Sequence, residues 1–268
     1  MAFDGNLAWK QATATMAANR ELVLALAGVF FFLPSFAMIM LIKQPQVAAG
    51  TPPEKMLAIL EPFILSMAPW FIIGSVVQTL GQATLIELFG HGGRATVGEA
   101  LRKSLGVILS YIAVQLLTGF MMTSVLMLAM TAGSIVSPVL GVALGCYLVA
   151  LAYGRLVAAG PVVVLERRKN PIAALVRAAQ LSRGHTLRLG NFLFLLAMAF
   201  FFAFFVLTVI VGIVAALTMG EGRAAEILSG FFSSAMTALG IAYFAAIAVA
   251  AYRQLAGRRP EQARLPFD

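Results

Sequence analysis

The sequence predicts an all-α polytopic membrane protein: a bundle of six transmembrane helices with short amphipathic interfacial helices. Composition is the first reason, because 61% of the 268 residues are hydrophobic and 11% are charged, against about 25% charged in a typical soluble domain. The mean hydropathy is +0.93. The second reason is a series of six apolar runs, each long enough to cross a hydrocarbon layer about 30 Å thick. The third is that the basic residues gather on one side of these runs.

The six runs indicate a single integral membrane domain over residues 1–268. We place the spans at about residues 22–42, 62–89, 104–131, 138–165, 189–219 and 227–252. The first run is too long, and starts too late in the chain, for a signal-peptide core, so we expect it to be retained. Three prolines are expected to start or bend spans. Pro34 predicts a kink in the first span, Pro62 the start of the second after an exposed loop at 43–61, and Pro161 a bend near the end of the fourth.

The basic residues predict how the bundle is oriented. Of the 19 Lys and Arg residues, only Lys43, Lys55 and Arg223 fall in loops on one side of the predicted spans, and Arg155 falls within a span. All the others lie on the opposite side, in the N-terminal segment, two loops and the C-terminal tail. Because Lys and Arg are retained on the cytoplasmic side of a membrane, we expect both the N- and the C-terminus to be cytoplasmic.

Two loops on the basic side have the sequence signals of interfacial helices. Thr96-x-x-Glu99 is a capping-box pattern, which predicts a helix over residues 96–105. Asn170-Pro171 places a capping residue before a proline at the first helical position, and Gly184 can end the helix that follows. Each predicted helix leads directly into a span.

A weak internal repeat accompanies these helices. The segments AWKQA at Ala8, ALRKS at Ala100 and ALVRAA at Ala174 stand at corresponding places, each before an outward span and a returning span. The spacing is uneven and the identity is low. The alternative is that any loop that enters a span favours an amphipathic lead-in, without any repeat.

The basic loops are the candidate site for lipid head groups. The net charge of +8 comes from residues at the ends of apolar runs, which fits contact with anionic lipid rather than with nucleic acid. A basic residue near an anionic leaflet gains about 1 kcal/mol. The candidate contacts are Arg102, Lys103, Arg167, Arg168, Lys169, Arg177 and Arg183.

A second candidate site lies within the spans. Polar residues there are costly and suggest a function, and the candidate intramembrane cluster comprises Gln78, Gln82, Glu87, Gln115 and Arg155. These side chains could line a polar cleft, with an ion pair between Glu87 and Arg155. The alternative is structural: Glu87 reaches the interface, Arg155 is held by carbonyls or lipid phosphate, and the glutamines hydrogen-bond between helices.

Residues suited to catalysis or metal binding are scarce. The single cysteine, Cys146, lies in an apolar run, and both histidines, His91 and His185, lie in basic loops. The sequence has no HExxH, GxSxG or Walker phosphate-loop pattern. We therefore expect neither a cofactor nor a metal, and predict that the protein is not an enzyme.

The basic loop at residues 161–184 carries a family pattern. It joins a proline-led apolar segment, an acidic residue, a capped Ala-x-x-Arg helix and a closing Leu-x-x-Gly: Pro161–Val164, Glu166, Asn170-Pro171, Ala174 to Arg177, and Leu181 to Gly184. This pattern resembles the membrane-domain family of glycerophosphoryl diester phosphodiesterases and the related, uncharacterised YciC-type inner-membrane proteins of bacteria. The chain departs from it at Ala178, where the family usually has serine.

The resemblance implies a multi-pass protein of the bacterial inner (cytoplasmic) membrane. It transfers no catalytic residue, because the phosphodiesterase activity of fused relatives belongs to a soluble barrel with acidic and histidine residues, which we do not expect within these 268 residues. The first functional hypothesis is thus a non-enzymatic protein of membrane, envelope or lipid organisation whose basic interfacial helices contact anionic lipid. The alternative is a transporter, flippase or channel for lipid or a small solute. Protein partners cannot be identified from the sequence.

Overall fold

The computed structural model describes residues 3–41, 52–92, 96–220 and 222–257. Within these ranges all regular structure is helical, and six helical stretches are long and apolar enough to cross a membrane. They are Arg20–Met40, Glu54–Gly90, Ile108–Ser134, Pro138–Leu165, Thr186–Met219 and Arg223–Leu255. The prediction of an all-α chain with six spans is therefore confirmed.

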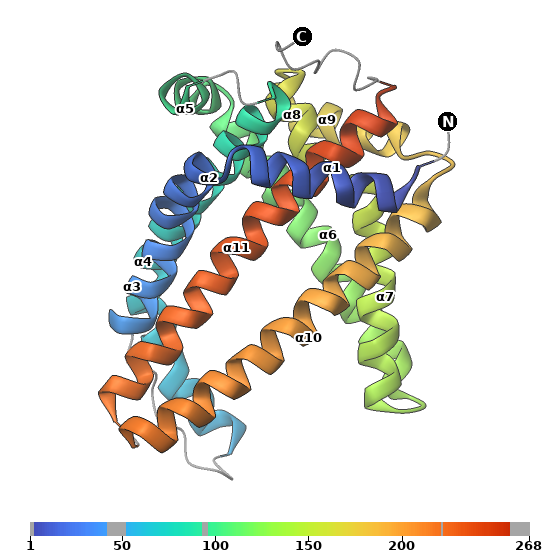
Figure 1. The fold of residues 1–268 in the computed structure, drawn as a ribbon. Helices are drawn as coiled ribbons and strands as arrows, with labels where there is room; N and C mark the ends of the chain where they lie inside the picture. The colour runs from blue at the N-terminus through green and yellow to red at the C-terminus, as the bar shows by residue number, and fades with distance from the viewer. Residues whose placement is uncertain (1–2, 42–51, 93–95, 221, 258–268) are drawn as a thin grey trace.

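Figure 1 shows how the described helices are arranged. In chain order they are α1 (Gly5–Ala18), α2 (Arg20–Ala27), the π-helical turn η1 (Gly28–Phe32), α3 (Leu33–Leu41), α4 (Pro53–Gly90), α5 (Val97–Leu105), α6 (Ile108–Ser134), α7 (Pro138–Leu156), α8 (Ala159–Leu165), α9 (Pro171–Leu181), α10 (Thr186–Met219) and α11 (Arg223–Leu255).

Prolines account for two of the irregular positions within the spans. Pro34 has no N–H to donate, and the turn before it widens into η1, where the Leu33 N–H bonds the Gly28 carbonyl five residues earlier. Pro161 likewise cannot bond the Val157 carbonyl, and the fourth span divides there into α7 and α8. The helices are therefore irregular near both Pro34 and Pro161, as predicted.

The start of the second span was predicted wrongly. We expected an exposed loop up to Glu61 and a helix from Pro62, but α4 begins at Pro53 and continues through Pro62 and Pro69. Pro53 stands in the first helical turn, where its fixed φ favours the helix and its missing N–H costs nothing. The rest of the expected loop, residues 42–51, lies outside the described residues.

The helices predicted after Thr96 and Asn170 are present with their capping groups. Thr96 and Glu99 form the reciprocal bonds of a capping box at α5, and the Asn170 side chain accepts a hydrogen bond from the Ala173 N–H at the start of α9. Gly184, with φ of 84°, follows α9 in the left-handed conformation that glycine tolerates.

Short helices gather at one end of the bundle, which we name the capped end: α1, α5, α8 and α9 (Figure 1). The first and last helices, α1 and α11, meet there. The Asp4 N–H donates to Gln254 Oε1 at 3.1 Å, and Gln254 Nε2 donates to the Asp4 carbonyl at 3.2 Å, so the start of α1 is joined to the end of α11. The core also lies at this end, around the last turns of α4, the whole of α8 and the last third of α11.

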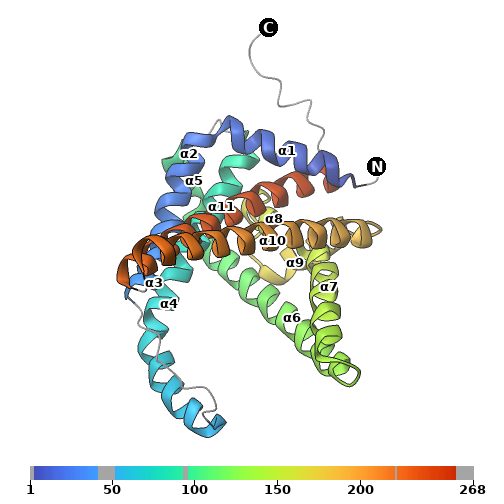
Figure 2. The same ribbon diagram turned by 60° about the horizontal axis from the view of Figure 1, so that its bottom comes forward.

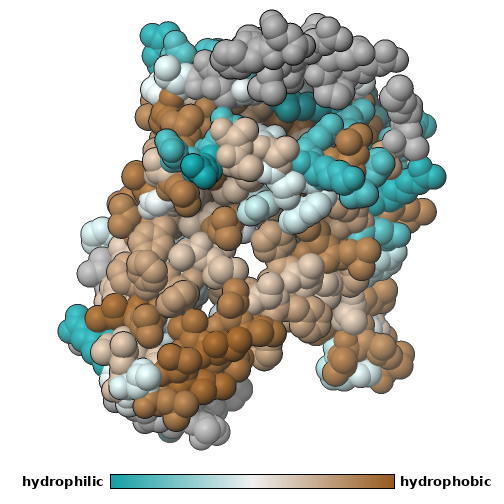
Figure 3. Space-filling view, viewed as in Figure 1, coloured by the Kyte–Doolittle hydropathy of each residue, from teal (hydrophilic) through white to brown (hydrophobic). Residues whose placement is uncertain are grey.

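At the opposite, open end the helices separate. The α6–α7 hairpin diverges from α3, α4 and the start of α11 in both ribbon views (Figures 1 and 2). Large apolar side chains there are exposed, among them Ile72, Leu128 and Leu217. The space-filling view has polar residues concentrated towards the capped end and apolar residues over most of the remainder (Figure 3).

Each third of the chain has the same order of elements. A short helix at the capped end (α1, α5 or α9) is followed by an outgoing span and a returning span. The short helices also bury the same pair of small residues four positions apart: Ala8 and Ala12, Ala100 and Ser104, Ala174 and Ala178. These pairs start the three segments of the weak sequence repeat, and small residues let helices approach closely.

Candidate functional site

Glu87, near the end of α4, is a fully buried carboxylate surrounded by basic groups. Its Oε1 lies 2.8 Å from Arg167 Nη2, 3.6 Å from Lys103 Nζ and 3.7 Å from His91 Nδ1. A buried carboxylate is tolerated when cations and hydrogen bonds compensate for its lost hydration. Glu87 Oε2 is buried and has no hydrogen-bond partner among the described residues.

Arg167 is positioned by its backbone as well as by Glu87. Its φ of 55° is in the left-handed region, which costs a non-glycine residue about 1–2 kcal/mol. The guanidinium bonds Glu87 through Nη2 and the Lys103 carbonyl through Nη1, at 2.6 Å. One side chain from the α8–α9 connection thus joins the end of α4 to α5.

Glu166 is a second acidic centre, directly after α8. Its Oε2 accepts a hydrogen bond from Arg168 Nε at 3.0 Å, and its Oε1 accepts one from the Tyr252 hydroxyl at 3.1 Å. Arg177 Nε of α9 lies 3.7 Å from the same Oε1. Glu166 therefore ties α9 and α11 to the end of the fourth span.

The two acidic centres occupy equivalent places in the repeat. At each centre, a glutamate at the end of a returning span faces a basic residue of the next short helix, Lys103 in α5 or Arg177 in α9. Each of these basic residues lies three positions after the first buried small residue of its helix. The third copy lacks this ion pair, because Gln11 stands at the corresponding position of α1. There the returning span meets the short helix through the Asp4–Gln254 bonds instead.

The seven candidate head-group contacts divide into two sets. Four of them have an acidic partner: Lys103, Arg167, Arg168 and Arg177. The other three, Arg102, Lys169 and Arg183, are exposed and form no ion pair with any residue that the structure describes. We name these three the unpaired cations.

Exposed apolar side chains accompany the unpaired cations. Leu105 at the end of α5 is 52% exposed, and Ile172 and Val176 of α9 are 65% and 51% exposed. The opposite face of each helix is packed on the protein through its buried small residues. A helix that packs one face against the protein and exposes apolar and basic side chains on the other is suited to the boundary between acyl chains and head groups.

The candidate intramembrane cluster is not a single cluster. Gln115 Nε2 donates to Gln82 Oε1 at 2.8 Å, so these two residues do meet. Gln78, one turn away, lies 3.4 Å from the Ser35 hydroxyl of the first span instead. Glu87 belongs to the capped end, as described above.

The ion pair between Glu87 and Arg155, one of the two alternatives for these residues, is absent from the described residues. Arg155 is exposed, and its side chain makes no ion pair or hydrogen bond within the described ranges. Its carbonyl accepts a hydrogen bond from the Ser182 hydroxyl at 2.8 Å, which holds α9 against α7. The positions of two residues on different spans do not reveal how each helix is rotated about its axis. This rotation turns Glu87 and Arg155 to different surroundings.

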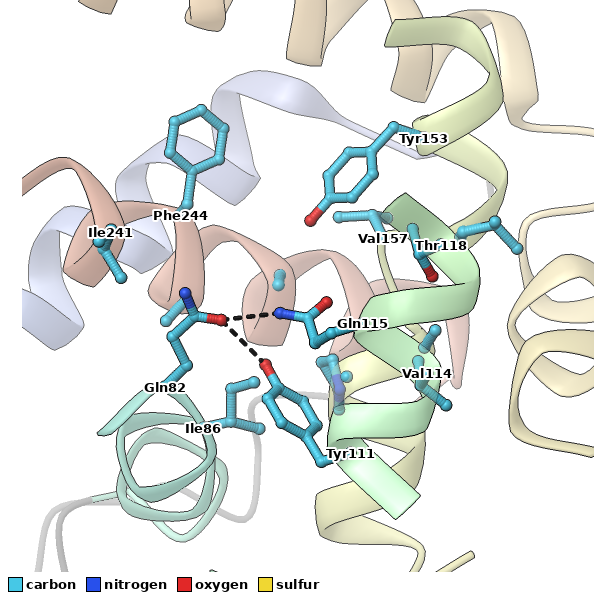
Figure 4. Close-up of a pocket in the computed structure, with 16 residues that line it drawn as sticks. Gln82, Ile86, Tyr111, Val114, Gln115, Thr118, Tyr153, Val157, Ile241 and Phe244 are labelled. Atoms are coloured by element: carbon cyan, nitrogen blue, oxygen red, sulfur yellow. Dashed lines mark hydrogen bonds between the residues drawn. The ribbon is translucent and has the colours of Figure 1, made fainter. Parts of the chain in front are cut away.

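Gln82 and Gln115 line a cavity of about 340 Å³ between α4, α6, α7, α8 and α11. The Tyr111 hydroxyl donates to Gln82 Oε1 at 3.4 Å. In Figure 4 the Tyr153 hydroxyl and the two amides point into the same space, with Phe244 of α11 on the far side. None of the described residues that line the cavity is charged.

Sequence reasoning did not find the tyrosines of this cavity or the role of Arg253. Tyr111 and Tyr153 lie within spans, where aromatic residues have no distinctive spacing. Arg253 Nη2 donates to the carbonyls of Phe89 and Gly90, at 2.5 and 3.3 Å, and so completes the end of α4. No sequence signal marks these residues, because their roles depend on contacts between helices far apart in the chain.

The residues on which the expected resemblance rests serve the packing of the capped end. Pro161, Val162, Val163 and Val164 are buried in α8, while Glu166 and Arg177 face each other. The ranges that the structure describes contain no group of three or more His, Cys, Asp or Glu residues that could hold a metal ion.

No family model, no curated protein and no solved structure matches the chain. The fold and these contacts define a membrane-embedded protein with six apolar helices. Its polar interactions concentrate at the capped end.

Proposed function

We propose that this is a non-enzymatic, multi-pass protein of the bacterial inner membrane that binds anionic lipid head groups at its capped end. In this role it contributes to membrane, envelope or lipid organisation. The resemblance of residues 161–184 to the phosphodiesterase membrane-domain and YciC-type families supports the location, and the capped end faces the cytoplasm in this proposal.

The observation that carries the proposal is the set of unpaired cations, Arg102, Lys169 and Arg183. A basic side chain that already has an acidic partner offers little net charge to a lipid, whereas an exposed and unpaired one attracts phosphate. Beside them, Ile172 and Val176 are exposed apolar residues that would be stable in acyl chains. This pairing of exposed apolar and basic side chains favours a lipid surface over an aqueous protein partner.

Reconstitution at two lipid compositions tests the proposal. The double variant Arg102→Gln/Arg183→Gln is expected to lose about 2 kcal/mol of attraction to anionic lipid, at about 1 kcal/mol for each cation. The measurement is the retention of phosphatidylglycerol by the purified protein, against phosphatidylcholine, by mass spectrometry of the extracted lipid.

Lys55→Gln/Arg223→Gln is the matched control, because it removes the same charge near the starts of α4 and α11, away from the capped end. The proposal fails if the two double variants retain phosphatidylglycerol equally. Arg167 is not used, because its loss would leave buried Glu87 without its nearest cation.

Labelling of single cysteines tests the orientation separately. With Cys146 replaced by alanine, a cysteine introduced at Arg183 is expected to react with a membrane-impermeant reagent only from the cytoplasmic side. One introduced at Arg223 is expected to react only from the other side. Reaction of both from the same side would overturn the six-span topology.

A second candidate, transport of a lipid or a small solute, is favoured by the cavity between the spans. It predicts that liposomes containing the protein have a flux that the variant Gln82→Leu/Gln115→Leu abolishes. Equal flux in protein-free liposomes would reject it.

A further inference from the structure

The cavity between the spans contains more hydrogen-bonding capacity than its own residues use. Gln82 Oε1 accepts from Gln115 and Tyr111. Within the described residues, the Gln82 amide nitrogen, Gln115 Oε1 and the Tyr153 hydroxyl have no partner. Because all of them border one space (Figure 4), a single group there could reach several of them.

Thr118 adds an independent observation. Its side chain lines the cavity and is 6% exposed, and its hydroxyl is buried with no hydrogen-bond partner in the described ranges. Threonines in membrane helices ordinarily donate to the carbonyl four residues earlier. Thr84, Thr131, Thr218 and Thr237 of this protein do so. Thr118 therefore has an unsatisfied buried hydroxyl on a residue that borders the cavity, which is costly unless a ligand completes it.

The lining restricts the ligand to an uncharged group. No described residue of the cavity carries a charge, and an ion brought there would lose its hydration without a counterion. Hydroxyl, ester and amide groups match the amides and hydroxyls that are present. The Glu87 centre and the unpaired cations do not line the cavity, so phosphate binding at the capped end is a separate matter.

The surroundings of the cavity indicate a lipid rather than a solute. Gln82 lies five residues before Glu87 on α4, about 7 Å along the axis towards the middle of the span. The space-filling view has an opening at mid-height, in the area between α10 and α11 of Figure 1 (Figure 3). A volume of about 340 Å³ is at the small end of ligand sites, so it would hold a polar group and leave acyl chains to extend outwards.

We propose that this cavity binds the hydroxyl and ester groups of an uncharged lipid with a free hydroxyl, such as a diacylglycerol. Gln82, Gln115 and Tyr153 bond the polar group, and Thr118 gains the partner that it lacks. The apolar side chains of Ile86, Ile241 and Phe244 contact the start of the acyl chains. The proposal goes beyond lipid binding at the capped end, because it assigns a second site with a different ligand.

Photolabelling tests this site. The protein is placed in phosphatidylcholine nanodiscs with a trace of diacylglycerol that carries a diazirine on one acyl chain. Unlabelled diacylglycerol, phosphatidylglycerol and free glycerol serve as competitors. We expect diacylglycerol alone to compete, with labelled peptides from α6, α7 or α11. Equal competition by phosphatidylglycerol would overturn the uncharged site, and competition by glycerol at similar concentrations would overturn its assignment to a lipid.

Variants of the lining identify the site. Thr118→Val keeps the shape of the side chain and is expected to weaken competition by diacylglycerol about 3- to 10-fold, which is the range for one hydrogen bond. Gln82→Leu/Gln115→Leu is expected to weaken it more. Thr131→Val is the matched control in the same helix, because the Thr131 hydroxyl bonds its own backbone, and it should label like the unchanged protein.

The stability of the same variants separates loss of the site from misfolding. Without diacylglycerol, Thr118→Val should melt at the same temperature as the unchanged protein or slightly higher, since it removes an unsatisfied polar atom. The variant Arg102→Gln/Arg183→Gln should keep full diacylglycerol labelling, so failure of this proposal is distinguishable from failure of head-group binding. Full labelling of both cavity variants would overturn the site.

Discussion

The capped and open ends of the bundle are both helical, but different interactions stabilise them. At the capped end, α4 buries the side chains from Ala83 to Phe89 with no exposed residue between them, and α11 buries those from Ala245 to Tyr252. Two glutamates with basic partners lie in the same region. At the open end, α4 and α10 expose long runs of apolar side chains, including residues 70–73 and 205–207.

This difference indicates where the fold is determined. Burial within the protein and polar pairing both require close neighbours, and only the capped end has them from all three thirds of the chain. The apolar surfaces of the open end are satisfied by acyl chains, which are as apolar as leucine and do not drive helices together. Substitutions at the two ends should therefore have very different consequences.

The largest expected contrast concerns phenylalanines of the two ends. Phe89 is fully buried at the end of α4, and Phe202 of α10 is 60% exposed. Phe89→Ala should lower the free energy of unfolding by about 3–5 kcal/mol, because it leaves a cavity in a packed region. Phe202→Ala should change it by less than about 0.5 kcal/mol. Thermal unfolding in detergent compares the two, and similar losses would remove the distinction between the ends.

Loss of the cation closest to Glu87 should have the next largest effect. Arg167→Gln is expected to cost about 3 kcal/mol, because it removes the nearest partner of a buried carboxylate. Lys103, at 3.6 Å, limits the loss. The double variant Glu87→Gln/Arg167→Gln should recover much of it, since no unpaired charge is then buried.

Arg102→Gln is the control for this prediction, because it makes the same substitution at an exposed cation without an acidic partner. It should have little effect on the unfolding temperature. If Arg167→Gln were equally harmless, the Glu87 centre would not stabilise the capped end.

A smaller contrast involves two glycines of one helix. A Cβ added to Gly190, near the start of α10, would lie 2.7 Å from the Leu151 Cα of α7, whereas one added to Gly212 would meet nothing within 4 Å. Gly190→Ala should therefore cost about 1–3 kcal/mol by forcing α7 and α10 apart. Gly212→Ala should stabilise the helix by up to about 1 kcal/mol. Unfolding curves that shift in the same direction would contradict this difference in packing.

The sequence was sufficient to predict the number of spans and several of the positions where helices begin or become irregular. The six runs, the caps at Thr96 and Asn170, and the effects of Pro34 and Pro161 depend on local rules: bilayer thickness, capping chemistry and the missing N–H of proline. The start of α4 was misjudged because a proline can begin a helix or lie within one, and the tertiary context at Pro53 and Pro62 decides which.

The partners of individual side chains, by contrast, could not be predicted from the sequence. The sequence marked Glu87 and Arg155 as polar residues within spans, and it marked all seven basic residues of the loops alike. The rotation of each helix about its axis decides which cation meets Glu87 and which three cations remain unpaired. It also decides that Tyr111, Thr118 and Tyr153 share a cavity with Gln82. That rotation is set by contacts between residues distant in the chain, so only the tertiary structure could decide it.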